Sequence, residues 1–180
     1  FILMDALFEG KPVTYCPYIF VDNDAALGRG WSQGYPKRMG QVFQTRYYAA
    51  TGKAGPALAP GSKFAGSLTS AGQRLAEGVV TLKEPLTDLS QFASRPVLNL
   101  LHYPRLAADK RDKPAIHEIV ENVPRDVRIE QPWIGEGSLS LPVCRGEEIS
   151  ELAPLRCGKG IRASMSYVVD DLTTLKDLRA

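Results

Sequence analysis

The sequence predicts an α+β fold of mainly antiparallel β-strands, in a single domain over residues 1–180. Three observations favour this class. The chain contains 16 glycines and 13 prolines, and turn-forming residues at this frequency leave little room for long helices. The segments between them are mostly short and rich in aromatic and β-branched residues, as strands are. Helical spacing of leucines is confined to the C-terminal end.

In the first half of the chain, residues 1–8 and 15–21 are expected to form two strands. The tetrapeptide Glu9-Gly10-Lys11-Pro12 is typical of a turn between them, and the acidic run Asp22-Asn23-Asp24 ends the second strand. Further along lie glycine-bearing turns at Thr51-Gly52 and Pro60-Gly61, strands over 63–83 around Gly72 and Gly78, and a helical turn over 87–92.

In the second half, strands are expected over 95–103, 116–123, 127–131, 138–141 and 161–169. The charged segment 106–114 predicts a solvated connection, and Trp133-Ile134-Gly135-Glu136-Gly137 predicts a turn. Alternation over 161–169 places Met165 and Tyr167 on one face of that strand. Asp170 is expected to cap a closing helix, because Leu172, Leu175 and Leu178 would fall on one side of it.

Composition excludes several classes of protein. Hydrophobic residues make up 44% and charged residues 23%, values that are normal for a globular protein. The net charge is +2 and the basic residues are scattered, so no nucleic-acid partner is expected. No apolar run approaches the ~20 residues that span a bilayer, so no membrane partner is expected.

Metal sites and disulfides are not expected either. Cys16, Cys144 and Cys157 are widely spaced and form no CxxC pair, which favours a reduced, cytoplasmic setting. His102 and His117 are fifteen residues apart and without a metal-ligand neighbour, so both are interpreted as structural or surface residues. Phosphate-binding glycine motifs and a G-x-S-x-G nucleophile elbow are also missing from the sequence.

Lys37 is the residue with the clearest chemical potential. Trp31, Tyr35 and Met39 make its surroundings unusually apolar, although a solvated surface lysine is the default for this residue type. A neutral lysine amine attacks ketones to form an imine, which is an electron sink and needs no metal or organic cofactor. Forming that neutral amine requires a pKa well below the usual value of about 10.4. Burial lowers it, and so does a neighbouring cation such as Arg38, although adjacent strand residues face opposite sides.

A resemblance to a known family rests on a set of short motifs in this part of the chain. They are Phe8-x-Gly10, Tyr15, Val21-Asp22-Asn23, the run from Gly34 to Gly40 (GYPKRMG), the strand RPVLNLLHYP and the turn Gln131-Pro132-Trp133-Ile134-Gly135. Together they resemble acetoacetate decarboxylase over nearly the whole chain. The resemblance implies a β-cone or barrel with a few peripheral helices, an imine on Lys37, a basic neighbour at Arg38 and a pocket tyrosine at Tyr35.

Two departures from the family pattern qualify this resemblance. The family's upstream arginine and catalytic glutamate would precede Phe1, which implies a further N-terminal segment, or a companion chain from the same precursor. The segment before Lys37 is similar instead to a divergent branch of aldolase-dehydratases, in which a glutamine and a late-strand tyrosine line the pocket. Here these would be Gln33 and Tyr167. Trp31 is a further candidate for the pocket. Each of these three residues also has an ordinary structural alternative. Gln33 could be a turn residue, and Tyr167 and Trp31 could be packing residues.

Three hypotheses follow. The first is a lyase that decarboxylates acetoacetate or a related β-keto acid through an imine on Lys37. The second is an aldolase-dehydratase that condenses pyruvate or a related keto acid with an aldehyde. The third is a non-catalytic ligand-binding protein on the same fold. The resemblance also implies a homo-oligomer, whose interface the sequence does not show.

Overall fold

A computed structural model describes residues 1–49, 54–92, 95–169 and 172–179. The chain divides into two compact units. The first contains Phe1–Met39, Ala93–Val127 and Tyr167–Ala180, and the second contains Gly40–Phe92 and Arg128–Ser166. None of the helices in the described ranges is both long enough and apolar enough to cross a membrane.

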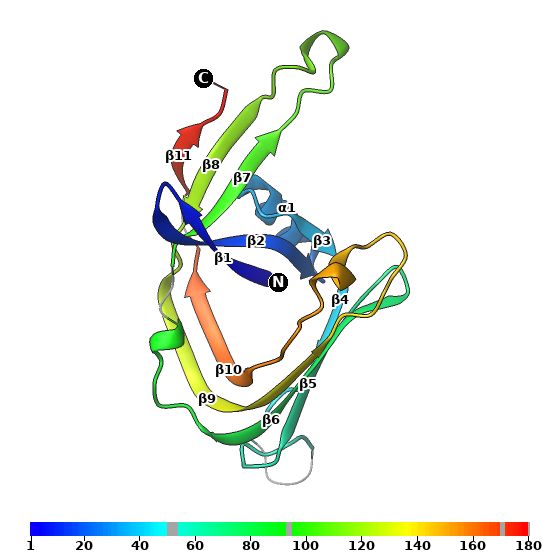
Figure 1. Cartoon of the computed structure of the whole chain (residues 1–180), viewed down its shortest axis with the longest axis vertical. Coiled ribbons are helices and arrows are strands. Elements are labelled where there is room, and N and C mark those ends of the chain that lie inside the picture. Colours follow the sequence, from blue (N-terminus) through cyan, green and yellow to red (C-terminus); the bar gives the residue numbers. More distant parts are fainter. Residues whose placement is uncertain (50–53, 93–94, 170–171, 180) are drawn as a thin grey trace. The chain divides into compact units, whose positions relative to one another are not determined.

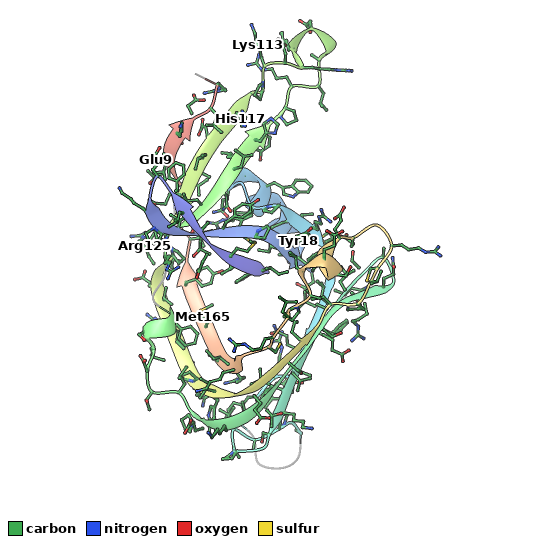
Figure 2. All side chains as sticks on the ribbon, viewed as in Figure 1. Glu9, Tyr18, Lys113, His117, Arg125 and Met165 are labelled. Atoms are coloured by element: carbon green, nitrogen blue, oxygen red, sulfur yellow. The ribbon has the colours of Figure 1, made fainter. Side chains whose placement is uncertain are left out.

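A six-stranded sheet forms the framework of the first unit among the described residues (Figure 1). Its order is β1 (Ile2–Phe8), β2 (Lys11–Val21), β7 (Val97–Tyr103), β8 (Ile116–Asn122) and β11 (Thr173–Asp177), with β3 (Lys37–Met39) paired to β2. The β1–β2 hairpin turns at Glu9 and Gly10, both at positive φ, as the turn signal predicts (Figure 2).

The connection from β2 to β3 contains a helix that the sequence did not predict. Helix α1 (Asp24–Ser32) begins where Asn23 accepts a hydrogen bond from the Ala26 amide at 2.9 Å, a common side-chain cap. Two glycines inside the segment made it resemble a loop. Because α1 is a crossover, β3 runs parallel to β2, and Ile19 lies opposite Lys37.

A five-stranded antiparallel sheet forms the framework of the second unit, in the part of the chain that the structure describes. Its order is β10 (Lys159–Val168), β9 (Arg125–Ser140), β6 (Gln73–Pro85), β5 (Lys63–Ser70) and β4 (Gln41–Gln44). Figure 1 shows β6 and β9 bending strongly along their length. Short 3₁₀ turns occur in this unit at η1 (Ser90–Phe92) and η3 (Ile149–Leu152). A further 3₁₀ turn, η2 (Ala108–Lys110), belongs to the first unit.

Each unit has its own apolar core, and the predicted α+β class with mainly antiparallel strands is confirmed. In the first unit the buried apolar residues come from β2, β7 and β8: Val13, Cys16, Ile19, Phe20, Leu98, Leu101 and Val120. In the second they are Phe64, Leu75, Leu82, Leu141 and Ile149. The three cysteines are all free.

The predicted turn at residues 133–137 is wrong, because β9 continues through it. Gly135 pairs with Leu82 of β6, next to a register shift in that ladder. Glycine allows the backbones of β6 and β9 to approach closely at this point. A Cβ there would lie 2.7 Å from the Thr81 carbonyl carbon and 2.9 Å from the Leu82 Cα. A glycine inside a strand often marks such an approach rather than a turn.

The predicted closing helix is also wrong, because the segment forms strand β11. Thr173 and Thr174 pair with Glu121 and Val120 of β8, and β-branched residues favour this state. Arg179 then binds the Asp177 carboxylate at 2.7 Å, and this partner holds the pKa of Asp177 at about 2. The expected cap, Asp170, and the turn at Thr51-Gly52 lie outside the described residues.

Replacing Gly135 by alanine is expected to destabilise the second unit by about 3 kcal/mol, because β6 and β9 would have to separate. Gly78→Ala is the matched control on β6, since its added Cβ would make only ordinary contacts, with the Ser138 carbonyl oxygen at 3.4 Å and the Leu139 Cδ1 at 3.9 Å. Urea denaturation measures both. Equal stabilities of the two variants would contradict the assigned close approach at Gly135.

Candidate functional site

The turn between α1 and β3 sets the position of Lys37. The Tyr35 amide donates to the Gly30 carbonyl at 2.9 Å, and the Gly34 amide donates to the Trp31 carbonyl at 3.1 Å. With Gly34 at φ +76°, this is the Schellman arrangement that ends helices. The Lys37 amide then donates to the Tyr35 carbonyl at 2.8 Å across Pro36. The chain thereby reverses within three residues and begins β3 at Lys37.

The side chain of Lys37 lies along helix α1 rather than in solvent. A Cβ on Gly30, the buried residue of α1, would overlap the Lys37 Cγ, Cδ and Cε atoms, so the lysine stem occupies that space. The ammonium group reaches back about one helical turn and donates to the Ala26 carbonyl at 2.8 Å. It also lies 5.9 Å from the centroid of the Tyr35 ring. Lys37 is therefore half-buried with a defined geometry.

The surroundings of Lys37 lower the pKa of its amine. Burial lowers the pKa of Lys37, the nearby Arg29 guanidinium lowers it further, and the Cys16 thiol acts in the opposite direction. Arg29 is exposed, and its guanidinium donates to the Val169 carbonyl at 2.8 Å. This bond joins α1 to the end of the segment that carries Tyr167. Arg29 was not a candidate in the sequence, because the unpredicted helix places it beside Lys37.

Tyr35 connects the lysine to the sheet. Burial raises the pKa of its phenol, and the Asn99 side chain on β7 acts to lower it. Cys16 and Tyr167 are also close enough to influence the charge on this phenol. The predicted candidates Tyr35, Lys37 and Tyr167 therefore lie in one neighbourhood within the first unit. Tyr167 is 44% exposed, and Met165 beside it on β10 is also exposed, so neither is a core residue.

The remaining predicted candidates flank this group. Gln33 is the C-cap residue of α1 and is half-buried. Its backbone N–H donates to the Gly30 carbonyl at 3.0 Å. The Trp31 indole donates to the Lys37 carbonyl at 2.8 Å, which fixes the backbone of the lysine. Arg38 lies over the ring of Tyr18 on β2, at 5.8 Å (Figure 2 labels Tyr18). The roles proposed for Gln33 and Arg38 stay predictions.

The two histidines are closer than their spacing suggests. His102 pairs with His117 across β7 and β8, and their ring centroids are 4.9 Å apart (Figure 2 labels His117). In the described ranges, no three His, Cys, Asp or Glu side chains gather in a way that could hold a metal ion.

The profile of the acetoacetate decarboxylase (ADC) family matches residues 1–178. The chain belongs to the acetoacetate decarboxylase family. The first unit of this chain contains Lys37, Tyr35 and the strand RPVLNLLHYP, which are among the motifs that carry the resemblance. Among curated proteins, none matches the chain in sequence.

Solved structures agree with this family. The enduracididine biosynthesis enzyme MppR, determined with HEPES buffer bound, is 32% identical over 98% of this chain, with a TM-score of 0.86. The match covers 63% of MppR, so this chain spans less than two thirds of that enzyme. MppR has also been determined with pyruvate, and with the condensation product of pyruvate and imidazole 4-carboxaldehyde.

More distant members share the fold. An acetoacetate decarboxylase-like enzyme from Sphingomonas wittichii RW1 is 24% identical over 98% of this chain and 68% of its own, with a TM-score of 0.87. The acetoacetate decarboxylase of Legionella pneumophila is 17% identical over 99% of this chain and 66% of its own, with a TM-score of 0.81.

Gly30→Ala is expected to expel the Lys37 side chain from its slot on α1, so the pKa of Lys37 should rise toward its ordinary value as burial is lost. The pH dependence of Lys37 acetylation by acetic anhydride, followed by peptide mass spectrometry, measures this change. Gly28→Ala is the control, because its Cβ on the same helix would meet nothing within 4 Å. Identical acetylation profiles for both variants would contradict the placement of the Lys37 side chain against Gly30.

Removing the charge with Arg29→Met is expected to raise the pKa of Lys37, because a neighbouring cation that disfavours the ammonium is lost. Arg29→Lys should retain the effect, and added salt should weaken it in the wild type because Arg29 is exposed. The same acetylation profile measures all three. A larger rise in the Lys37 pKa with Arg38→Met than with Arg29→Met would show that Arg38, and not Arg29, is the cation that lowers this pKa.

Proposed function

We propose that the protein is an enzyme that forms an imine between Lys37 and a small keto acid. The observation that carries the proposal is the placement of Lys37: its stem occupies the Gly30 slot, and burial and Arg29 both lower the pKa of its amine. A fixed amine with a depressed pKa is the property required of an imine-forming nucleophile. Membership of the acetoacetate decarboxylase family supports the same chemistry.

The chemistry follows from the neutral amine. Its lone pair attacks the keto carbon, the carbonyl electron pair moves to oxygen, and loss of water leaves a protonated imine. This imine accepts an electron pair from a neighbouring carbon. In decarboxylation the pair comes from the bond to the departing CO₂, and in condensation it comes from a C–H bond whose proton leaves. Both give an enamine. Protonation of the enamine that decarboxylation leaves, followed by hydrolysis of the resulting imine, releases a ketone and regenerates Lys37.

Condensation of pyruvate or a related keto acid with an aldehyde is the finer reaction that we favour. It is supported by the 32% identity to MppR, which has been determined with pyruvate and with a condensation product of pyruvate. Here the enamine carbon attacks the aldehyde carbon, the aldehyde oxygen takes up a proton, and loss of water gives a conjugated imine on Lys37. Hydrolysis of this imine releases the conjugated keto acid and regenerates Lys37. Tyr35 and Tyr167 are the phenols available to move these protons, and Gln33 is a candidate to orient the keto acid.

Decarboxylation of acetoacetate or another β-keto acid is the second candidate, and the family match supports it. The structures named as decarboxylases share the fold at low identity, such as 17% for the Legionella enzyme, and support only the architecture. A binding protein without activity is the third possibility. It would keep the pocket while leaving Lys37 without an imine.

Borohydride reduction in the presence of pyruvate is expected to leave a stable adduct on the peptide that contains Lys37, because hydride reduces the imine to a secondary amine. Lys37→Arg keeps the charge and should give no adduct, while circular dichroism shows whether it folds. Intact-mass and peptide mass spectrometry measure the product. A protein that is trapped by no keto acid, acetoacetate included, would refute the imine-forming function.

Two incubations separate the finer candidates. Pyruvate with imidazole 4-carboxaldehyde should produce an absorbing conjugated product if condensation is the reaction, and acetoacetate should then yield no acetone above the Lys37→Arg control. Acetone without a conjugated product would remove condensation and leave decarboxylation.

A further inference from the structure

Two buried amides in the first unit have no partner. Asn99 on β7 is 3% exposed and Asn122 on β8 is 1% exposed. Neither the oxygen nor the nitrogen of either side chain makes a hydrogen bond in the part of the chain that the structure describes. A buried polar group left unpaired costs about 1–3 kcal/mol, so such groups call for an explanation.

The two amides share one face of the sheet but have different neighbours. Asn99 pairs with Val120 and Asn122 pairs with Val97, so the two asparagines are diagonal neighbours on the β7–β8 ladder. The register of β2 with β7, continued by one residue from the Tyr15–Leu98 pair, brings Cys16 beside Asn99 on the same face. Asn99 therefore lies between the thiol that influences Lys37 and the second asparagine.

The turn that carries Tyr35 lies directly over Asn99. A Cβ on Gly34 would be 3.2 Å from the Asn99 Cβ and 3.2 Å from the Leu101 amide nitrogen, so this turn packs tightly against β7 at that point. Tyr35 is the next residue, and the Asn99 side chain acts to lower the pKa of its phenol, against the larger effect of burial. Asn122 is not among the groups that influence Tyr35 or Lys37. Of the two amides, Asn99 is therefore the one placed at the turn that carries Tyr35.

We propose that Asn99 is a positioning residue of the imine site, whose side-chain amide holds the Tyr35 phenol so that its hydroxyl faces the substrate oxygen at Lys37. The proposal rests on the proposed function. In this proposal the Asn99 nitrogen, which has no hydrogen-bond partner among the described residues, would donate to the phenol oxygen and leave the phenol proton free for the substrate. The centroid of the Tyr35 ring lies 5.9 Å from the Lys37 nitrogen, so holding this ring would also keep it near the imine.

Asn99→Leu tests this role, with Asn122→Leu as the matched control, because both replace an equally buried, unpartnered amide by an apolar side chain of similar size. In steady-state turnover of pyruvate with imidazole 4-carboxaldehyde, Asn99→Leu is expected to lower kcat about a hundredfold with little change in KM. Asn122→Leu should leave kcat nearly unchanged. Asn99→Ser, which replaces the amide by a hydroxyl that can still donate a hydrogen bond, should recover part of the activity and covers the case in which the leucine variant does not fold.

A double-mutant cycle shows whether Asn99 acts through Tyr35. If it does, Tyr35→Phe combined with Asn99→Leu should be no slower than Tyr35→Phe alone. Additive losses in the cycle, or equal losses of kcat in the Asn99 and Asn122 variants, would overturn the proposal.

One measurement separates this proposal from the imine function on which it rests. The titration of Tyr35, followed by NMR of ¹³Cζ-labelled tyrosine and assigned with Tyr35→Phe, needs no substrate. Asn99→Leu should raise the pKa of Tyr35, because the lowering influence of the amide is lost, and Asn122→Leu should not. An unchanged titration would refute the contact. A shifted titration in a protein that borohydride and keto acids do not label would refute the imine function and keep the contact.

Discussion

The contact between the aliphatic stem of Lys37 and the backbone of Gly30 is the constraint on which the candidate site depends. A residue with a side chain at position 30 would fill the space in which the lysine lies. The contact exists because the Schellman turn at Gly34 returns the chain along the helix that it has just left. Trp31 completes the arrangement by binding the Lys37 carbonyl, so the lysine is held at its stem and at its backbone.

This placement also determines the chemistry of the amine. Burial against α1 is the largest influence on the pKa of Lys37, and the Arg29 guanidinium acts in the same direction. Both influences therefore increase the neutral fraction of the amine at a given pH. Desolvation as the leading cause fits the extended β3 strand, in which neighbouring residues such as Lys37 and Arg38 face opposite sides.

The first unit combines scaffold and site in the same strands. β2 contributes Ile19 and Phe20 to the core, and it pairs with β3 at Lys37. β7 contributes Leu98 and Leu101 to the core, and it places Asn99 beneath the turn at Gly34. A substitution in these strands therefore affects stability and the candidate site together, which is why matched pairs such as Asn99 and Asn122 are needed to separate the two effects.

The sequence by itself determined the features that depend on near neighbours: the alternating strands, the β1–β2 turn, and the apolar neighbours of Lys37, namely Trp31, Tyr35 and Met39. Tertiary structure decided the rest. The segment around Gly135 became a strand because β6 approaches it closely, and the closing segment became β11 because β8 offers an edge. Arg29 and Asn99 joined the site through α1 and through β7. The physical reason is that periodicity records local spacing, whereas pairing, burial and a lysine pKa depend on groups that the fold brings together from distant parts of the chain.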